Sequence, residues 1–345
     1  MIWEMDKKYS IGNSHEDKVI DLLAKKYGDE ETSEYYRQML TTIGKLSADK
    51  RDIGDLKIIN ATIKELRYAF KIFAPYRNNR KVVIFGSHKI SNKSGEYKMA
   101  EEFSRKISEK GWMVITGGGN GIMEAGNKGA SPGKSFAVNI KLPTEQVPNP
   151  YVRGEKLVTL KYFFTRKLIF LKESDATVLF PGGFGTHDEG FEVLTLLQTG
   201  KNNPRPLVFV DTLFGNYWKS WLKFLENGMM KNNLLYKNDL NLFRVVNTVQ
   251  DAVNEVVNFY KVYNSLRYVG KRTILRLNKE ITGSQIEKLN RKYRDILVSG
   301  KIECCKPTPE ETKTNDKLHL FRLSMNFDRL SYGSLMALIH EINSL

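Results

Sequence analysis

The sequence predicts an α/β fold: a Rossmann-like, doubly wound parallel sheet with N-terminal helices and a small C-terminal α+β unit. Two observations lead to this prediction. From residue 81 onward, short apolar runs alternate with stretches of helical apolar spacing, the pattern of parallel strands joined by crossover helices. Three of the apolar runs end in glycine-containing turns, which line up along the carboxyl edge of such a sheet, where ligands bind.

The alternating elements lie in a central region that is predicted to span residues 79–261. Short apolar runs predict its strands, and longer stretches with apolar residues three and four positions apart predict its helices. The expected strands cover residues 81–85, 112–116, 135–140, 176–180 and 206–210. Two of the expected helices cover residues 96–110 and 162–173, and two more begin at residue 122 and near residue 191.

The two ends of the chain follow other patterns. Residues 1–78 form a predicted N-terminal extension of two or three helices. Residues 262–345 form a predicted C-terminal unit that resembles an incomplete ferredoxin-like fold. Its expected elements are a strand at 272–277, a helix at 284–297, a strand at 301–305, a polar hinge at 307–317, a strand at 318–327 and a helix at 334–342.

The most informative segment is Pro-Gly-Gly-Phe-Gly-Thr-His-Asp-Glu at residues 181–189, between a strand and a helix. Its glycines let backbone N–H groups approach an anion, and the positive end of the helix dipole points to the same place. The turn therefore predicts a phosphate site. We expect Glu189 in the first helical turn, about one turn from that phosphate.

Two further turns repeat this arrangement upstream. The segment Gly-Gly-Gly-Asn-Gly at 117–121 follows a strand and opens a helix, and Gly86 and Ser87 end another strand. A single glycine-rich turn is weak evidence, because tight turns alone require glycine. Three such turns at successive strand ends favour a nucleotide site.

These motifs resemble the Lonely Guy (LOG) family of nucleotide phosphoribohydrolases, which activate cytokinins. The family signature Pro-Gly-Gly-x-Gly-Thr-x-x-Glu falls on residues 181–189, its Arg-Lys pair on residues 166–167 and its Gly-Gly-Gly-x-Gly-Ile-Met-Glu segment on 117–124. The stretch 142–151 is similar to that of longer bacterial members. The resemblance covers residues 81 to about 260.

The resemblance implies hydrolysis of a nucleoside 5′-monophosphate, AMP-like or cytokinin-like, to free base and ribose 5-phosphate, without cofactor or metal. It gives the catalytic roles to Glu189, beside the developing positive charge on the sugar, and Arg166, which orients Glu189 or the substrate. It also implies at least a homodimer, with the helix that carries Arg166 near the interface. The substrate- and phosphate-binding residues that it implies are Gly86, Ser87, Gly118, Gly119, Asn120, Gly121, Met123, Lys167, Gly182, Gly183, Gly185 and Thr186.

His187 and Gly190 depart from the family pattern, which usually carries apolar residues at both positions. His187 is either a ligand contact or a solvated side chain, and the solvated side chain is the favoured interpretation. A glycine inside a helix costs roughly 1 kcal/mol relative to alanine, so we expect close packing against Gly190.

Composition is that of an ordinary cytoplasmic protein: no apolar run reaches the ~20 residues that span a bilayer, the start lacks a signal pattern, and the only cysteines are Cys304 and Cys305. The net charge of +15 exceeds the need of a small-nucleotide enzyme. Residues 261–306 hold twelve basic and four acidic side chains, a pattern of either a solvated face or an anion-binding patch. The solvated face is the favoured interpretation, and nucleic acid the less favoured partner.

Two other functions compete with hydrolysis. One is a catalytically silent nucleotide sensor or DNA-binding protein of the same fold, which would not need both Arg166 and Glu189. The other is a pyridoxal-phosphate decarboxylase, suggested by Ser87-His88-Lys89, whose spacing differs from that of such enzymes.

Overall fold

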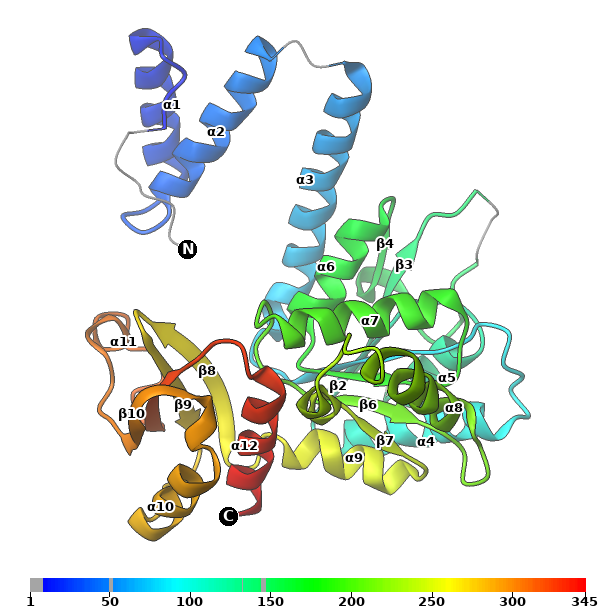
Figure 1. Cartoon of the computed structure of the whole chain (residues 1–345). Helices are drawn as coiled ribbons and strands as arrows, with labels where there is room; N and C mark the ends of the chain where they lie inside the picture. Colours follow the sequence, from blue (N-terminus) through cyan, green and yellow to red (C-terminus); the bar gives the residue numbers. More distant parts are fainter. Residues whose placement is uncertain (1–8, 50–51, 132, 144–146) are drawn as a thin grey trace. The chain divides into compact units, whose positions relative to one another are not determined.

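The computed structural model of the chain describes residues 9–49, 52–131, 133–143 and 147–345 (Figure 1). Its internal contacts divide it into residues 1–64 and 65–345, with the boundary inside helix α3. The first unit holds the predicted N-terminal helices, which are three in number: α1 (Ser14–Tyr27), α2 (Ser33–Ala48) and the start of α3 (Ile53–Phe73). The Asn13 side chain accepts hydrogen bonds at the start of α1 and so caps it.

The second unit is built on a seven-stranded parallel sheet of order β4-β3-β2-β1-β5-β6-β7, which confirms the predicted doubly wound α/β fold. The chain winds outward from β1 in one direction and from β5 in the other, so the switch point lies between these two strands. The strands are β1 (Lys81–Phe85), β2 (Met113–Thr116), β3 (Ser135–Ile140), β4 (Leu157–Leu160), β5 (Ala176–Leu179), β6 (Leu207–Val210) and β7 (Arg244–Val246).

Helices cover both faces of this sheet (Figure 1). Alternate residues of β1 point to opposite faces: Val82 and Ile84 belong to one core cluster, Val83 and Phe85 to the other. Because both faces are buried, the strands are continuous apolar runs. The helices are α4 (Gly95–Glu109), α5 (Ile122–Gly129), α6 (Phe163–Glu173), α7 (Phe184–Gln198), α8 (Tyr217–Phe224) and α9 (Val249–Asn258).

The C-terminal residues form a four-stranded antiparallel sheet of order β10-β11-β9-β8. Asn343 on the last helix accepts hydrogen bonds from the backbone N–H groups of Val262 and Tyr263, both at 2.9 Å, and so ties the end of the chain to the start of this sheet. The elements are β8 (Tyr263–Val269), β9 (Arg272–Leu277), α10 (Gly283–Lys292), β10 (Leu297–Cys304), α11 (Pro309–Lys313), β11 (Phe321–Phe327) and α12 (Tyr332–Ser344).

Several boundaries correct the sequence predictions. The helix expected at 284–297 ends at Lys292; residues Arg294–Ile296 form a separate 3-10 turn, and Leu297 begins strand β10. The hinge expected at 307–317 contains helix α11, because the side chains of Thr308 and Glu311 form a capping box. Strands β4, β7 and β8 were not predicted: the first two are short, and β8 is only partly buried and so lacks a clear apolar run.

Among the described residues, none of the helices combines the length and apolar character needed to cross a membrane. Over the same residues, no cluster of three or more histidine, cysteine or acidic side chains is placed to hold a metal ion.

Candidate active site

The three predicted glycine turns meet at the carboxyl edge of the sheet, next to the switch point. The backbone N–H of Ser87 donates to the carbonyl of Pro181 at 3.0 Å, and the N–H of Ile122 donates to the carbonyl of Ser87 at 3.1 Å. Glycine is required where the turns touch: a Cβ on Gly121, whose φ is +64°, would lie 2.4 Å from the Ser87 carbonyl oxygen. The turns therefore form one hydrogen-bonded platform.

Helix α7 begins at Phe184, with Gly183 as its N-cap residue. Glu189 therefore lies in the second turn of the helix and not in the first, which corrects the sequence prediction. A Cβ on either Gly183 or Gly185 would meet no atom within 4 Å, so open space adjoins this helix start. The first N–H groups of a helix lack the usual partner one turn earlier, and here the exposed residues Phe184 and Gly185 present theirs to an anion, whereas Thr186 donates to the Gly183 carbonyl at 3.0 Å.

A cleft of about 520 Å³ lies over this helix start. It joins turns from β1, β3 and β5 to the first residues of α6 and α7. Its wall combines polar groups with apolar side chains that the sequence analysis did not single out. The lining residues are Phe85, Gly86, Ser87, His88, Lys89, Met123, Ile140, Leu142, Phe163, Arg166, Gly183, Phe184, Gly185, Thr186, Asp188 and Glu189.

Glu189 is the buried carboxylate of this cleft, with only 7% of its surface exposed. Burial raises its pKa to about 7, against the opposing effect of the cations Lys167 and Arg166. The Lys167 ammonium lies 3.7 Å from the Glu189 carboxylate and 2.8 Å from the carboxylates of Asp188 and Glu192. Lys167 on α6 thus forms ion pairs with the acidic face of α7. It lies beside the cleft and is not one of the lining residues.

Arg166 reaches the cleft from α6 through a tight passage. Its Nε–H donates to the carbonyl of Val138 at 2.9 Å, and its guanidinium lies 5.0 Å from the centre of the Phe170 ring. A Cβ on Gly117 would lie 2.2 Å from the guanidinium Nη2, so glycine is needed there to make room for the arginine. Burial lowers the pKa of Arg166, while the Glu189 charge opposes that shift.

The second glycine turn supports the platform more than it lines the cleft. Asn149 donates to the carbonyls of Gly118 and Gly119 at 2.9 and 3.0 Å, and its side chain also donates to Asn127 Oδ1. These bonds fix the segment that resembles longer bacterial members, of which residues 144–146 lie outside the described part of the chain. The predicted binding residues that do not line the cleft are Gly118, Gly119, Asn120, Gly121, Lys167 and Gly182.

His187 is half-buried, which corrects the prediction of a solvated side chain. Its Nε2 lies 2.7 Å from the Tyr217 hydroxyl, and its ring lies near those of Phe191 and Trp218. Burial lowers its pKa. The close packing expected at Gly190 is confirmed, because a Cβ there would lie 2.9 Å from Leu179 Cδ2 on β5. His187 and Gly190, the two residues that depart from the family pattern, thus both pack α7 against neighbouring elements.

Comparison with known proteins agrees with this geometry. The family described as "Possible lysine decarboxylase" matches residues 118–256. A cytokinin riboside 5′-monophosphate phosphoribohydrolase of Mycobacterium tuberculosis is 28% identical over 160 residues, 45% of this chain and 82% of the relative. The central region of this chain is thus similar to this family and to its phosphoribohydrolase members.

Other similar proteins match the same central region. The pyrimidine/purine nucleotide 5′-monophosphate nucleosidase of Escherichia coli K12 is 28% identical over 141 residues, 38% of this chain and 30% of the relative. Among solved structures, the Moco carrier protein of Chlamydomonas reinhardtii is 21% identical, with a TM-score of 0.37, over 52% of this chain and 96% of that chain.

Proposed function

We propose that this chain hydrolyses the N-glycosidic bond of a nucleoside 5′-monophosphate and releases the free base and ribose 5-phosphate. The observation that carries the proposal is the position of Glu189: a buried carboxylate with a pKa raised to about 7, in the same cleft as the open helix start at Gly183–Thr186. A general base is most effective when its pKa lies near the working pH.

The cleft offers a place for each part of such a substrate. The N–H groups at the start of α7 and the exposed Lys89 suit the 5′-phosphate. An apolar side suits the base; it is formed by Met123, Ile140, Leu142, Phe163 and Phe184. Phe184 is 97% exposed, so its ring is available to stack on a planar ligand.

The reaction follows from this placement. Positive charge develops on the anomeric carbon as the C–N bond breaks and its electron pair moves to the base. Glu189 stabilises that charge and takes a proton from the attacking water, whose oxygen bonds to the anomeric carbon. Solvent supplies the proton that the departing base nitrogen gains, and Glu189 returns its own proton to solvent. Arg166 holds the substrate by parallel hydrogen bonds, and Lys167 positions Glu189.

A paired-substrate assay tests the proposal. The full chain is incubated with a panel of nucleoside 5′-monophosphates and with the matching nucleosides, and free base is measured by chromatography. A nucleoside would leave the donors at the start of α7 unpaired, so we expect AMP or another monophosphate to react at least 100-fold faster than its nucleoside. Equal rates for adenosine and AMP would contradict the phosphate site, and no base from any monophosphate would contradict hydrolysis.

We also propose that α6 contributes to a homodimer interface. Phe164 and Leu168, one helical turn apart, are 51% and 46% exposed. Apolar side chains at this spacing form a stripe suited to a second copy of the chain. Light scattering should give at least the dimer mass for the full chain and a lower mass for Phe164→Glu. A monomeric wild-type protein would contradict this proposal.

A further inference from the structure

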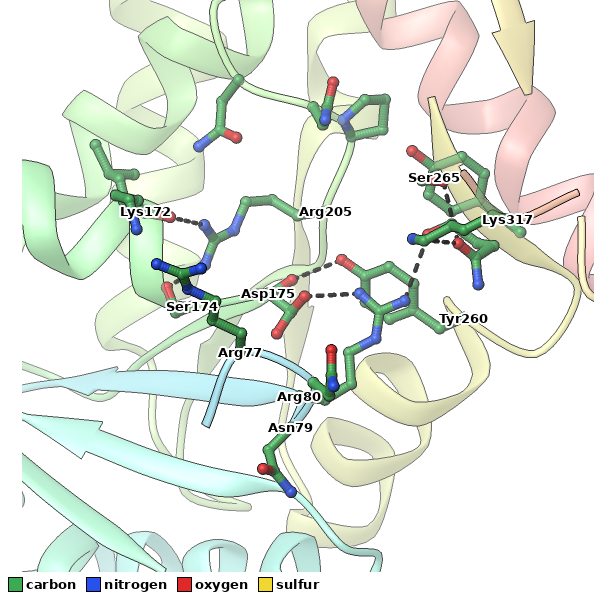
Figure 2. Close-up of a pocket in the computed structure, with 17 residues that line it drawn as sticks. Arg77, Asn79, Arg80, Lys172, Ser174, Asp175, Arg205, Tyr260, Ser265 and Lys317 are labelled. Atoms are coloured by element: carbon green, nitrogen blue, oxygen red, sulfur yellow. Dashed lines mark hydrogen bonds and ion pairs between the residues drawn. The ribbon is translucent and has the colours of Figure 1, made fainter. Parts of the chain in front are cut away.

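A second cleft, of about 610 Å³, opens at the opposite, amino edge of the same sheet (Figure 2). It adjoins the residues just before β1, β5 and β6, and also Tyr263–Ser265 of the C-terminal sheet. The strands between the two clefts are four or five residues long, which separates the two edges by roughly 13–17 Å. This amino-edge cleft is therefore distinct from the candidate active site.

Positive charge dominates the amino-edge cleft. Its lining holds five cations, Arg77, Arg80, Lys172, Arg205 and Lys317, but only one carboxylate, Asp175. The Arg80 guanidinium forms an ion pair with the Asp175 carboxylate at 2.7 Å and also lies over the Tyr260 ring. Lys172 pairs with Glu173 outside the lining. Among the described residues, no carboxylate lies within ion-pair distance of the other three cations.

Two buried polar groups of this cleft have no partner. Arg205 is 97% buried, and its Nη atoms donate to the Leu171 carbonyl and to the hydroxyls of Ser174 and Thr177, yet its Nε–H has no hydrogen-bond partner among the described residues. The Tyr263 hydroxyl is also buried and unpaired. Buried polar groups are nearly always hydrogen-bonded, so two exceptions in the lining of one cationic cleft favour a polar ligand there.

Repulsion among the cations of this cleft also favours an anionic ligand. Burial lowers the pKa of Lys317, and the nearby Arg276 and Arg80 lower it further. Burial also lowers the pKa of Arg205. Figure 2 shows Arg77 and Arg205 on one side of the cleft and Lys317 on the other, so an anion between them would contact charges from both sides. Such an anion would stabilise the charged forms of all three.

We propose that the amino-edge cleft binds a small molecule that carries two or more phosphate groups. Guanidinium groups bind phosphate by two parallel hydrogen bonds, and the asparagine and serine side chains of the lining supply further donors. The cleft has the size of a small-molecule site. Its ligand would lie between the central seven-stranded sheet and the C-terminal sheet and would contact both. This site is independent of the proposed hydrolase activity.

Calorimetric titration of the full chain with inorganic pyrophosphate, at constant ionic strength, tests this site. We expect one saturable site and a concentration-dependent rise in Tm. The double variant Arg77→Ala/Lys317→Ala should weaken binding at least tenfold, because both side chains are exposed and neither has a carboxylate partner among the described residues; Lys317 donates only to Asn264 Oδ1, at 3.1 Å. Its matched control is Lys98→Ala/Lys223→Ala, which removes two exposed lysines outside the cleft and should bind like the wild type.

Two further arms identify the ligand and its location. Citrate should bind at least tenfold more weakly than pyrophosphate, and equal binding would overturn the assignment to phosphate groups. Lys89→Ala changes the carboxyl-edge cleft and should leave pyrophosphate binding intact. Binding lost in Lys89→Ala but kept in the double variant, no binding by the wild type, or equal weakening in the control would each overturn the proposal.

Discussion

The two edges of the central sheet each hold an arginine that reaches into a cleft, half-buried Arg166 at one edge and buried Arg205 at the other, but they surround it differently. At the carboxyl edge Arg166 lies near the carboxylate of Glu189, beside glycine turns that leave backbone N–H groups open. At the amino edge Arg205 is held by hydroxyls and a carbonyl, and the only carboxylate of the cleft is already paired with Arg80. The carboxyl edge therefore has a group that can exchange a proton near neutral pH, whereas the amino edge has only groups that bind.

Glu189→Gln gives the largest expected difference between the edges. Replacing the carboxylate by a neutral amide should reduce base release at least 100-fold, because it removes the charge that stabilises the transition state. Glu192→Gln is the matched control: Glu192 also pairs with Lys167 but does not line the cleft. It should keep most activity, as should Arg77→Ala at the amino edge. Comparable rates for Glu189→Gln and wild type would remove the functional contrast.

The pH profile of kcat/KM should report the carboxyl edge alone. A base with a pKa of about 7 is deprotonated above that pH, so the rate should level off above pH 7 and fall about tenfold per unit below it. Arg77→Ala should leave the profile in place. A flat profile from pH 5 to 8 would show that no group with this pKa governs the reaction.

Gly117→Ala tests the passage that admits Arg166. The added methyl group would overlap the guanidinium and displace it, so we expect about a tenfold loss of kcat/KM with the fold retained. Gly283→Ala, in a helix with open space around it, is the matched control and should be neutral. Unchanged kinetics in Gly117→Ala would show that the position of Arg166 is not important.

Stability should respond in opposite directions at the two edges. The folded pKa of Glu189 exceeds the ordinary glutamate value of 4.5, so its stabilising contribution is present below pH 4.5 and is lost as the pH rises through about 7. Glu189→Gln should therefore raise the free energy of unfolding at pH 8, by up to about 3 kcal/mol, and change it little at pH 4.

Arg205→Met should lower the free energy of unfolding at both pH values by about 2–4 kcal/mol, because it leaves buried acceptors unpaired. Denaturant unfolding at the two pH values checks both signs, and a less stable Glu189→Gln at pH 8 would contradict the burial of a charged carboxylate.

The sequence predicted the central fold because its signals are local. A strand buried on both faces is an apolar run, and the turns after β1, β2 and β5 need glycine at fixed places such as Gly121. The expectation of close packing at Gly190 rested on the same reasoning. Strand β8 carries no such signal, since its residues are only partly buried.

Parts of the site depend on contacts that no local pattern encodes. That Lys167 lies closer than Arg166 to the acidic face of α7 follows from how α6 packs on α7. The apolar wall joins Leu142, which follows β3, to Phe163, the first residue of α6. Lys89 could have been inferred from the sequence, because it lies two residues after Ser87 in the turn that follows β1. The amino-edge cleft combines residues from Arg77 to Lys317, so only the folded chain brings its cations together.

The most direct test of the central claim is a product analysis in water enriched in oxygen-18. The full chain is incubated with the monophosphate that reacts fastest, and both products are measured by mass spectrometry. We predict equal amounts of free base and ribose 5-phosphate, with the heavy oxygen on the anomeric carbon of the sugar. Release of inorganic phosphate with the base still attached to the sugar, or no release of base, would contradict the account.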